Sequence, residues 1–139
     1  MKFEFLDITP ADVCFLAYGE SLNKLFENSA LAMFSVMINT EQVKPEVKRA
    51  VEVNGEGLQS LMFNWLNELL FYYGAENLAF SKFEVRIDEK NFHLRADCFG
   101  EEIDPEKHEL RTEVKACTYH RLEVEKVKDG WKAQVILDI

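Results

Sequence analysis

Acidic groups near the two ends of the sequence are the best candidates for chemistry. Asp12 ends a Pro-containing loop, and Asp138 stands beside Ile139, whose α-carboxylate is a further oxygen donor. Carboxylate oxygens are hard ligands of the kind that divalent cations bind in proteins. Asp12 and Asp138 are 126 positions apart, so only a fold that brings the first loop to the last strand makes them one site. A frayed, solvated end is the alternative for the last two residues.

The cysteines and two of the histidines give weaker signals. Cys14, Cys98 and Cys117 are odd in number and widely spaced, so they predict neither a disulfide framework nor a zinc site, and we expect buried thiols. His93 alternates with charged residues and is expected to be solvated. His108 lies in an acidic segment, where an exposed loop residue is the default and a ligand or pH sensor is the alternative.

His120 closes the segment 113–120, EVKACTYH, which we expect to form a strand. Lys115, Thr118 and His120 are polar within this otherwise buriable run. A polar strand residue often satisfies a structural hydrogen bond, so the sequence leaves structural and functional roles equally open for them. The sequence contains neither a Gly-rich phosphate loop nor a GxSxG nucleophile elbow, so the inventory for catalysis is short.

The composition predicts one globular domain with an acidic surface. The 139 residues are 47% hydrophobic and 12% aromatic, enough for one sizeable core and too short a chain for two ordinary domains. We therefore expect a single domain over residues 1–139. The formal net charge of −9 repels phosphate backbones, so direct binding to RNA or DNA is not expected. A cation, or a protein partner with a basic face, matches this charge better.

The sequence gives no sign of a membrane or export segment. No apolar run approaches the roughly 20 residues that span a bilayer. The first six residues alternate charged with apolar side chains, unlike a secretory signal. We therefore expect a cytoplasmic protein.

The spacing of apolar residues predicts two helices among several strands. A three-four spacing indicates helices over 22–38, with Ser21 as N-cap, and over 58–73, with Gly74 as C-terminal stop. Alternation and turn residues indicate the strands 2–6, 13–18, 47–53, 82–87 and 92–98, and a last hairpin over 120–124 and 131–137.

The order of these elements predicts the fold class. Hairpins with two separated helices indicate an α+β fold, in which an antiparallel or mixed sheet has both helices packed on one face. The segment 100–110 is polar, acidic and Pro-containing, so we expect an exposed loop there.

Several motifs together resemble the archease family. TPAD, residues 9–12, stands where the family has a motif close to HTAD, and Tyr18 and Gly19 follow as in the family. The other matching motifs are FENSALAMFSVM (26–37), LMFNWLNELLF (61–71), GEEIDPEKHEL (100–110), EVKACTYH (113–120) and LDI (137–139). They occur in the family's order along nearly the whole chain. The family's His before Thr-Ala-Asp is not matched, whereas Asp12 is retained.

The resemblance implies an accessory protein of RNA metabolism and not an enzyme. Archeases act on the GTP-dependent tRNA-splicing RNA ligase, promoting guanylylation of its active-site histidine and allowing repeated turnover. They also bind a divalent ion, expected to be calcium, with Mg²⁺ or Mn²⁺ as alternatives. Carried over by position, the metal ligands are Asp12, Asp138 and Ile139. Lys115 and His120 become candidate contacts with the ligase.

Two other classes of function are alternatives to a ligase activator. In a stand-alone metal-dependent phosphoesterase, Asp12 and Asp138 would hold Mg²⁺ and His120 would be the general base. A general chaperone would instead bind unfolded clients through an exposed apolar patch, of which the sequence shows no sign.

Overall fold

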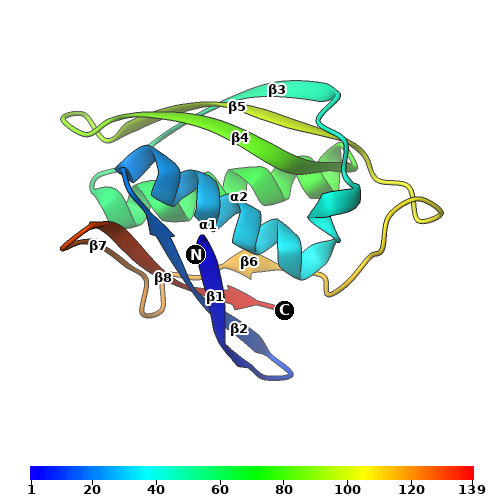
Figure 1. The fold of residues 1–139 in the computed structure, drawn as a ribbon, viewed down its shortest axis with the longest axis horizontal. Coiled ribbons are helices and arrows are strands. Elements are labelled where there is room, and N and C mark those ends of the chain that lie inside the picture. The colour runs from blue at the N-terminus through cyan, green and yellow to red at the C-terminus, as the bar shows by residue number, and fades with distance from the viewer.

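The computed structural model describes residues 1–139 and has two antiparallel sheets with both helices between them (Figure 1). This confirms the α+β class and the antiparallel pairing of the strands. In chain order the elements are β1 (Phe3–Ile8), β2 (Asp12–Gly19), α1 (Leu22–Met37), a 3₁₀ turn η1 (Thr40–Gln42), β3 (Val47–Asn54), α2 (Leu58–Ala75), β4 (Leu78–Asp88), β5 (His93–Glu102), β6 (Ala116–Cys117), β7 (Glu123–Val127) and β8 (Gly130–Asp138).

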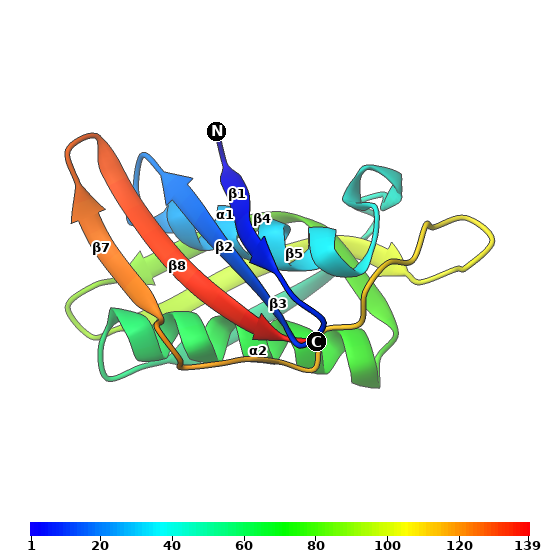
Figure 2. The same cartoon turned by 90° about the horizontal axis from the view of Figure 1, so that it is seen from below.

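The strands divide into a five-stranded and a three-stranded sheet. The first has the order β1-β2-β8-β6, with β7 also paired to β8, and the second has the order β3-β5-β4. Each sheet packs one face on the helices and leaves the other face open; Figure 2 views the five-stranded sheet from its open side. Because β2 pairs with β8, the first and last parts of the chain lie side by side inside this sheet.

The helices and both sheets share one hydrophobic core. A cluster of 34 buried residues joins them. In β2, Val13, Phe15 and Ala17 point inward, since alternate strand residues share a face. Trp65 of α2 is fully buried, and its Nε1–H donates to the Phe26 carbonyl of α1 at 3.0 Å. Neither helix combines the length and the apolarity that crossing a bilayer requires.

The helix ends follow local side-chain chemistry. Ser21 is the N-cap of α1, as predicted, and its hydroxyl oxygen accepts the Lys24 N–H at 3.1 Å. The predicted stop of α2 at Gly74 is wrong, because the helix continues to Ala75. Asn77, with φ of 55°, takes the left-handed conformation that turns the chain after the helix.

The last hairpin forms around the predicted turn at residues 129 and 130. Gly130 has φ of +146°, and a Cβ atom there would lie 2.3 Å from the Gly19 carbonyl oxygen. Only glycine fits this close approach between the turn and the end of β2. β7 begins at Glu123, so His120 lies outside the hairpin in which it was predicted.

The predicted strand over 113–120 is wrong except at its centre. Only Ala116–Cys117 forms a strand, and a turn follows in which the Leu122 N–H donates to the Tyr119 carbonyl at 3.2 Å. Cys117 pairs with β8 on one side, and on its other side Asn67 of α2 takes the place of a neighbouring strand. Its amide oxygen accepts the Cys117 N–H at 2.9 Å, and its NH₂ group donates to the Cys117 carbonyl at 3.1 Å.

The predicted exposed loop over 100–110 is also wrong at both of its ends. β5 extends to Glu102, and Glu101 and His108 are 8% and 3% exposed. The His108 Nδ1 atom accepts the Asp104 N–H at 2.9 Å, so the proton resides on Nε2, which donates to the Glu101 carboxylate at 2.8 Å. His108 is therefore a neutral structural residue and not an exposed loop residue.

Glu101 is the centre of a buried polar network. Besides His108, its carboxylate accepts the Lys107 ammonium at 2.7 Å and the Lys44 N–H at 2.9 Å. Burial alone would raise the pKa of Glu101, but the hydrogen bonds from Lys107, Lys44 and His108 outweigh it and lower that pKa from 4.5 to about 2. The ionised carboxylate thus ties the loop after β5 to the segment after η1.

We predict that Glu101→Gln lowers the free energy of unfolding at pH 7 by about 3 kcal/mol. By linkage, this is the stability that corresponds to the lowered pKa of Glu101. A lowered folded-state pKa contributes stability above the ordinary pKa of 4.5 that is lost as the pH falls toward 2. The difference between variant and wild type should therefore shrink over that range in urea unfolding. Glu102→Gln, at the exposed neighbouring position, is the matched control. A difference that is independent of pH would contradict the assignment.

Candidate metal centre at the ends of β2 and β8

The register of the central strands brings Asp12 and Asp138 together. β2 and β8 pair antiparallel, and Asp12 stands directly opposite Asp138 at one end of the pairing. Residues directly opposite in an antiparallel pair have their Cβ atoms about 4.5–5.5 Å apart. The two carboxylates, far apart in the sequence, are therefore neighbours in the fold.

Both acidic side chains emerge on the open face of the five-stranded sheet. Val13 and Leu137, the next pair along the two strands, are 2% and 0% exposed and point into the core. Because strand side chains alternate between faces, Asp12 and Asp138 point away from the core. Asp12 is exposed and Asp138 is half-buried. The pair is accordingly accessible from outside.

The TPAD loop holds the backbone of Asp12. The Thr9 hydroxyl oxygen accepts the N–H groups of Ala11 and Asp12 at 3.2 and 2.9 Å, and the Thr9 N–H donates to the Asp12 carbonyl at 2.9 Å. Such hydroxyl-to-backbone bonds close tight turns. Asp12 therefore begins β2 from a turn that is ordered by its own side-chain chemistry.

The end of the chain is also held in the sheet. The Asp138 carbonyl accepts the Lys115 N–H at 2.8 Å, and the Ile139 N–H donates to the Ala11 carbonyl at 3.0 Å. The last residue is thus bonded to the loop that precedes Asp12. A frayed terminus, the alternative interpretation of the sequence, does not describe this end.

The charges of the pair are not balanced by a basic side chain. None of the ion pairs within 4.0 Å involves Asp12 or Asp138. Like charges directly opposite each other destabilise a strand pair, by roughly 0.2–1 kcal/mol for such cross-strand interactions. A cation bound between the carboxylates would remove this repulsion.

The donor chemistry fits a hard divalent cation. The side chains offer carboxylate oxygens only, which Ca²⁺, Mg²⁺ and Mn²⁺ accept. No group of three or more His, Cys, Asp or Glu side chains gathers in a way that could hold a metal. The pair is therefore a partial ligand set, and any further ligands would be an Ile139 oxygen, water or another molecule.

The other candidate residues lie near the pair to different degrees. Lys115 is exposed, and its N–H bonds to the Asp138 carbonyl. His120 is exposed in the turn after β6. The Thr118 N–H, before that turn, bonds to the Ile136 carbonyl at 3.1 Å, two residues before Asp138. His120 is thus set back from the pair along the sheet.

The remaining histidine and cysteine predictions have mixed outcomes. His93, expected to be solvated, is half-buried, and its Nε2 atom lies 2.8 Å from the Glu52 carboxylate. Cys98 and Cys117 are buried as predicted, and burial raises the pKa of the Cys117 thiol to about 12. Cys14 is half-buried on the open sheet face, so the prediction of a buried thiol is wrong there. Burial, and then the charge of Asp7, raises the pKa of Cys14.

Comparisons with known proteins agree with the resemblance seen in the sequence. A model of the archease protein family matches residues 3–139. The protein archease of Methanosarcina mazei is 47% identical over 141 residues, covering 99% of this chain and 96% of that protein. The protein archease of Methanothermobacter thermautotrophicus is 50% identical over 139 residues, with 99% and 98% covered. The solution structure of a Methanobacterium thermoautotrophicum protein aligns with a TM-score of 0.86 and 49% identity, covering 99% of each chain.

The geometry predicts opposite effects of one substitution with and without metal. Asp138→Asn should weaken Ca²⁺ binding at least about tenfold, or ~1.4 kcal/mol, in calorimetric titration. Without metal, the same variant should be as stable as the wild type or more so, by roughly 0.2–1 kcal/mol, because the repulsion is relieved. Asp129→Asn, in the exposed turn before β8, is the control. Equal Ca²⁺ affinity of the wild type and Asp138→Asn would exclude Asp138 as a ligand.

Proposed function

Because the chain belongs to the archease family, we propose that it activates a GTP-dependent tRNA-splicing RNA ligase, promoting guanylylation and repeated turnover of that enzyme. The observation that carries the proposal is the family match over residues 3–139, which includes both members of the facing pair Asp12 and Asp138. In this proposal the ligase performs the chemistry and this chain is its non-catalytic accessory protein.

The position of the acidic pair supports an action on another protein. Both carboxylates lie at the end of two strands on an open sheet face, where a second protein can reach them. Ca²⁺ takes about six to eight oxygen ligands, and Asp12, Asp138 and an Ile139 oxygen fill only part of that number. The ligase, its nucleotide or water would complete the set.

A divalent cation at this position, calcium or else Mg²⁺ or Mn²⁺, would supply positive charge that offsets the charge of a nucleotide's phosphate groups. The chain's own residues provide the fixed framework. Thr9 orders the turn before Asp12, and the backbone bonds of Lys115 and Ile139 hold the residues at the end of β8. The backbones of both acidic residues are thereby held in place before a partner arrives.

The charge of the protein supports a protein partner over direct contact with RNA. With a formal net charge of −9, the chain repels a phosphate backbone and attracts a basic protein surface. Lys115 and His120 are proposed contacts with the ligase. Both are exposed, and Lys115 adjoins the acidic pair through its backbone bond to Asp138.

A ligation time course with limiting ligase tests the proposal. We expect product to exceed one equivalent of ligase only when this protein is present. Asp12→Asn and Asp138→Asn should each lower the stimulated rate at least about tenfold, or ~1.4 kcal/mol in the barrier, while Asp129→Asn keeps it. Full stimulation by both pair variants, or equal turnover without the protein, would refute the proposal.

The competing enzyme class is separated by omitting the ligase. The purified protein is incubated with phosphoester substrates and Mg²⁺ or Mn²⁺, and hydrolysis is measured. We expect none above the metal-only background. Metal-dependent turnover that disappears in Asp12→Asn would favour the phosphoesterase instead.

Extension of the chain tests the terminal carboxylate. Adding Gly-Ser after Ile139 moves the free carboxylate away from the pair while the Ile139 N–H can keep its bond to Ala11. If that carboxylate is a ligand, Ca²⁺ affinity and ligase stimulation should both fall. Unchanged values would leave Asp138 and the Ile139 carbonyl as the only donors from this end.

A further inference from the structure

β1 is an open edge strand of the five-stranded sheet, whereas helix side chains cover parts of the β4 and β6 edges. Along the outer edge of β4, the N–H groups of Val85 and Ile87 donate to the side chains of Glu27 and Asn23 of α1, at 2.9 and 3.0 Å. At β6, the Asn67 amide makes both backbone bonds of Cys117. Proteins cover edges in this way because unpaired strands attract other strands. β1 has no such cover.

The ladder between β1 and β2 shows which backbone groups of β1 are free. The Tyr18 N–H donates to the Lys2 carbonyl at 2.9 Å, and Glu4 then faces Leu16 in the same register. Hydrogen-bonded pairs alternate with non-bonded pairs in an antiparallel ladder. Phe3 and Phe5 are therefore the non-bonded residues, and their N–H and C=O groups point away from β2. No backbone hydrogen bond from outside the strand ladders reaches these groups.

β1 is also unusually apolar for an exposed edge. Phe5, Leu6 and Ile8 are 39%, 51% and 66% exposed, which places three of the molecule's exposed large apolar side chains on one six-residue strand. Charged residues normally blunt such an edge, and here only Glu4 and Asp7 do so. An exposed apolar edge is a template for strand addition.

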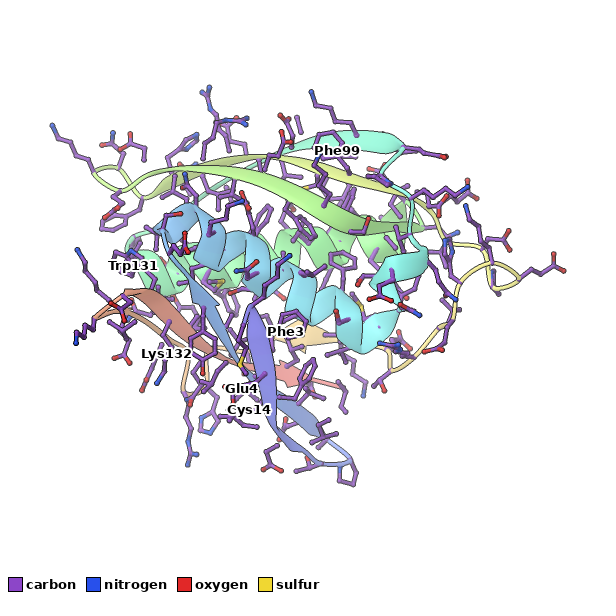
Figure 3. All side chains as sticks on the ribbon, in the orientation of Figure 1. Phe3, Glu4, Cys14, Phe99, Trp131 and Lys132 are labelled. Atoms are coloured by element: carbon purple, nitrogen blue, oxygen red, sulfur yellow. The ribbon has the colours of Figure 1, made fainter.

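A groove runs beside this edge over the exposed side of α1. Two cavities of about 890 and 730 Å³ adjoin there and share Lys2, Leu31, Ser81 and Lys82 as lining residues. Figure 3 views this side of the molecule and labels Phe3, which lines the smaller cavity, and Trp131, which lines the larger. β1 and β4 are not in contact across the groove, since no Cα atom of one lies within 8 Å of the other.

We propose that β1 pairs with an extended segment of a protein partner, which adds a strand to the five-stranded sheet. The free N–H and C=O groups of Phe3 and Phe5 specify a peptide backbone as the ligand. On the inner face, side chains of the added strand would enter the groove beside Leu31. On the outer face they would adjoin Glu4 and Asp7, so basic residues fit there.

The charges favour a partner over a second copy of the chain. Two molecules of net charge −9 repel each other, and pairing β1 with its own copy would bring together the carboxylates of Glu4 and Asp7. β1 also leads through the TPAD loop directly to Asp12. A partner strand on β1 would therefore join the sheet that carries the acidic pair, with β1 between it and β2. In naming the ligase as this partner, the inference rests on the proposed function.

The test measures binding of the protein to the ligase. Phe5→Lys places a charge on the edge and should weaken binding at least about tenfold in a fluorescence anisotropy titration with labelled ligase. Phe71→Lys makes the same change at a 60% exposed position of α2 and should bind like the wild type. Hydrogen exchange followed by NMR of the ¹⁵N-labelled wild type provides a second measurement. The Phe3 and Phe5 amides should become protected in the complex, because both become hydrogen-bonded.

Each other outcome overturns the inference in a recognisable way. Binding without protection of the Phe3 and Phe5 amides, or equal binding by Phe5→Lys and Phe71→Lys, would refute strand addition and leave the proposed function intact. A wild-type dimer that Phe5→Lys converts to monomer would assign the edge to a second copy. Absence of binding by the wild type would overturn both proposals.

Discussion

The antiparallel pairing of β2 with β8 is the interaction on which the rest of the structure depends. Over eight facing pairs it joins the start of the chain to its end. The same register buries Val13 opposite Leu137 and exposes Asp12 opposite Asp138. A slip of one residue would turn the apolar row outward and bury the acids. Burying each aliphatic side chain contributes about 1.5–3 kcal/mol, which outweighs the repulsion of one facing pair of like charges, about 0.2–1 kcal/mol.

Polar side chains of the helices explain why the strands form two sheets. Glu27 and Asn23 of α1 accept hydrogen bonds from N–H groups at the edge of β4, and Asn67 of α2 bonds to the backbone of β6. Because these edges are already bonded, neither sheet can extend into the other past a helix. The helices therefore act both as core layers and as edge covers. No helix side chain bonds to the outer edge of β1, which leaves that edge of the five-stranded sheet open to another molecule.

Local patterns predicted the elements well, and contacts distant in the sequence account for the errors. The three-four and two-residue spacings of apolar side chains correctly predicted both helices and most strands, because one face of each element must pack on the core. The predicted strand over 113–120 was wrong because the outer side of Cys117 is bonded by Asn67, fifty positions earlier in the sequence, and not by another strand. His108 is buried because its Nε2–H donates a hydrogen bond to the buried Glu101 carboxylate. The polar composition of the loop does not reveal this bond.

The acidic pair could not be found from spacing alone. The sequence marked both residues as candidate ligands, but no local rule links Asp12 to Asp138, and only the resemblance to a family joined them into one site before the fold was known. The structure adds that the two residues are direct cross-strand neighbours without a basic partner. It also shows that the TPAD loop and Ile139 are bonded to each other through Ala11, so the two halves of the candidate site are one connected unit.

In the proposed function, Asp12 and Asp138 act together through one bound ion. It is tested by a double-mutant cycle on ligase stimulation, with Asp12→Asn, Asp138→Asn and the double variant, at a Ca²⁺ concentration that half-saturates the wild type. A shared ion predicts that each single variant loses nearly all of the stimulation and that the double variant loses no more, so the effects are strongly non-additive. Additive losses from the two substitutions would show that the carboxylates act independently and would refute a shared ion.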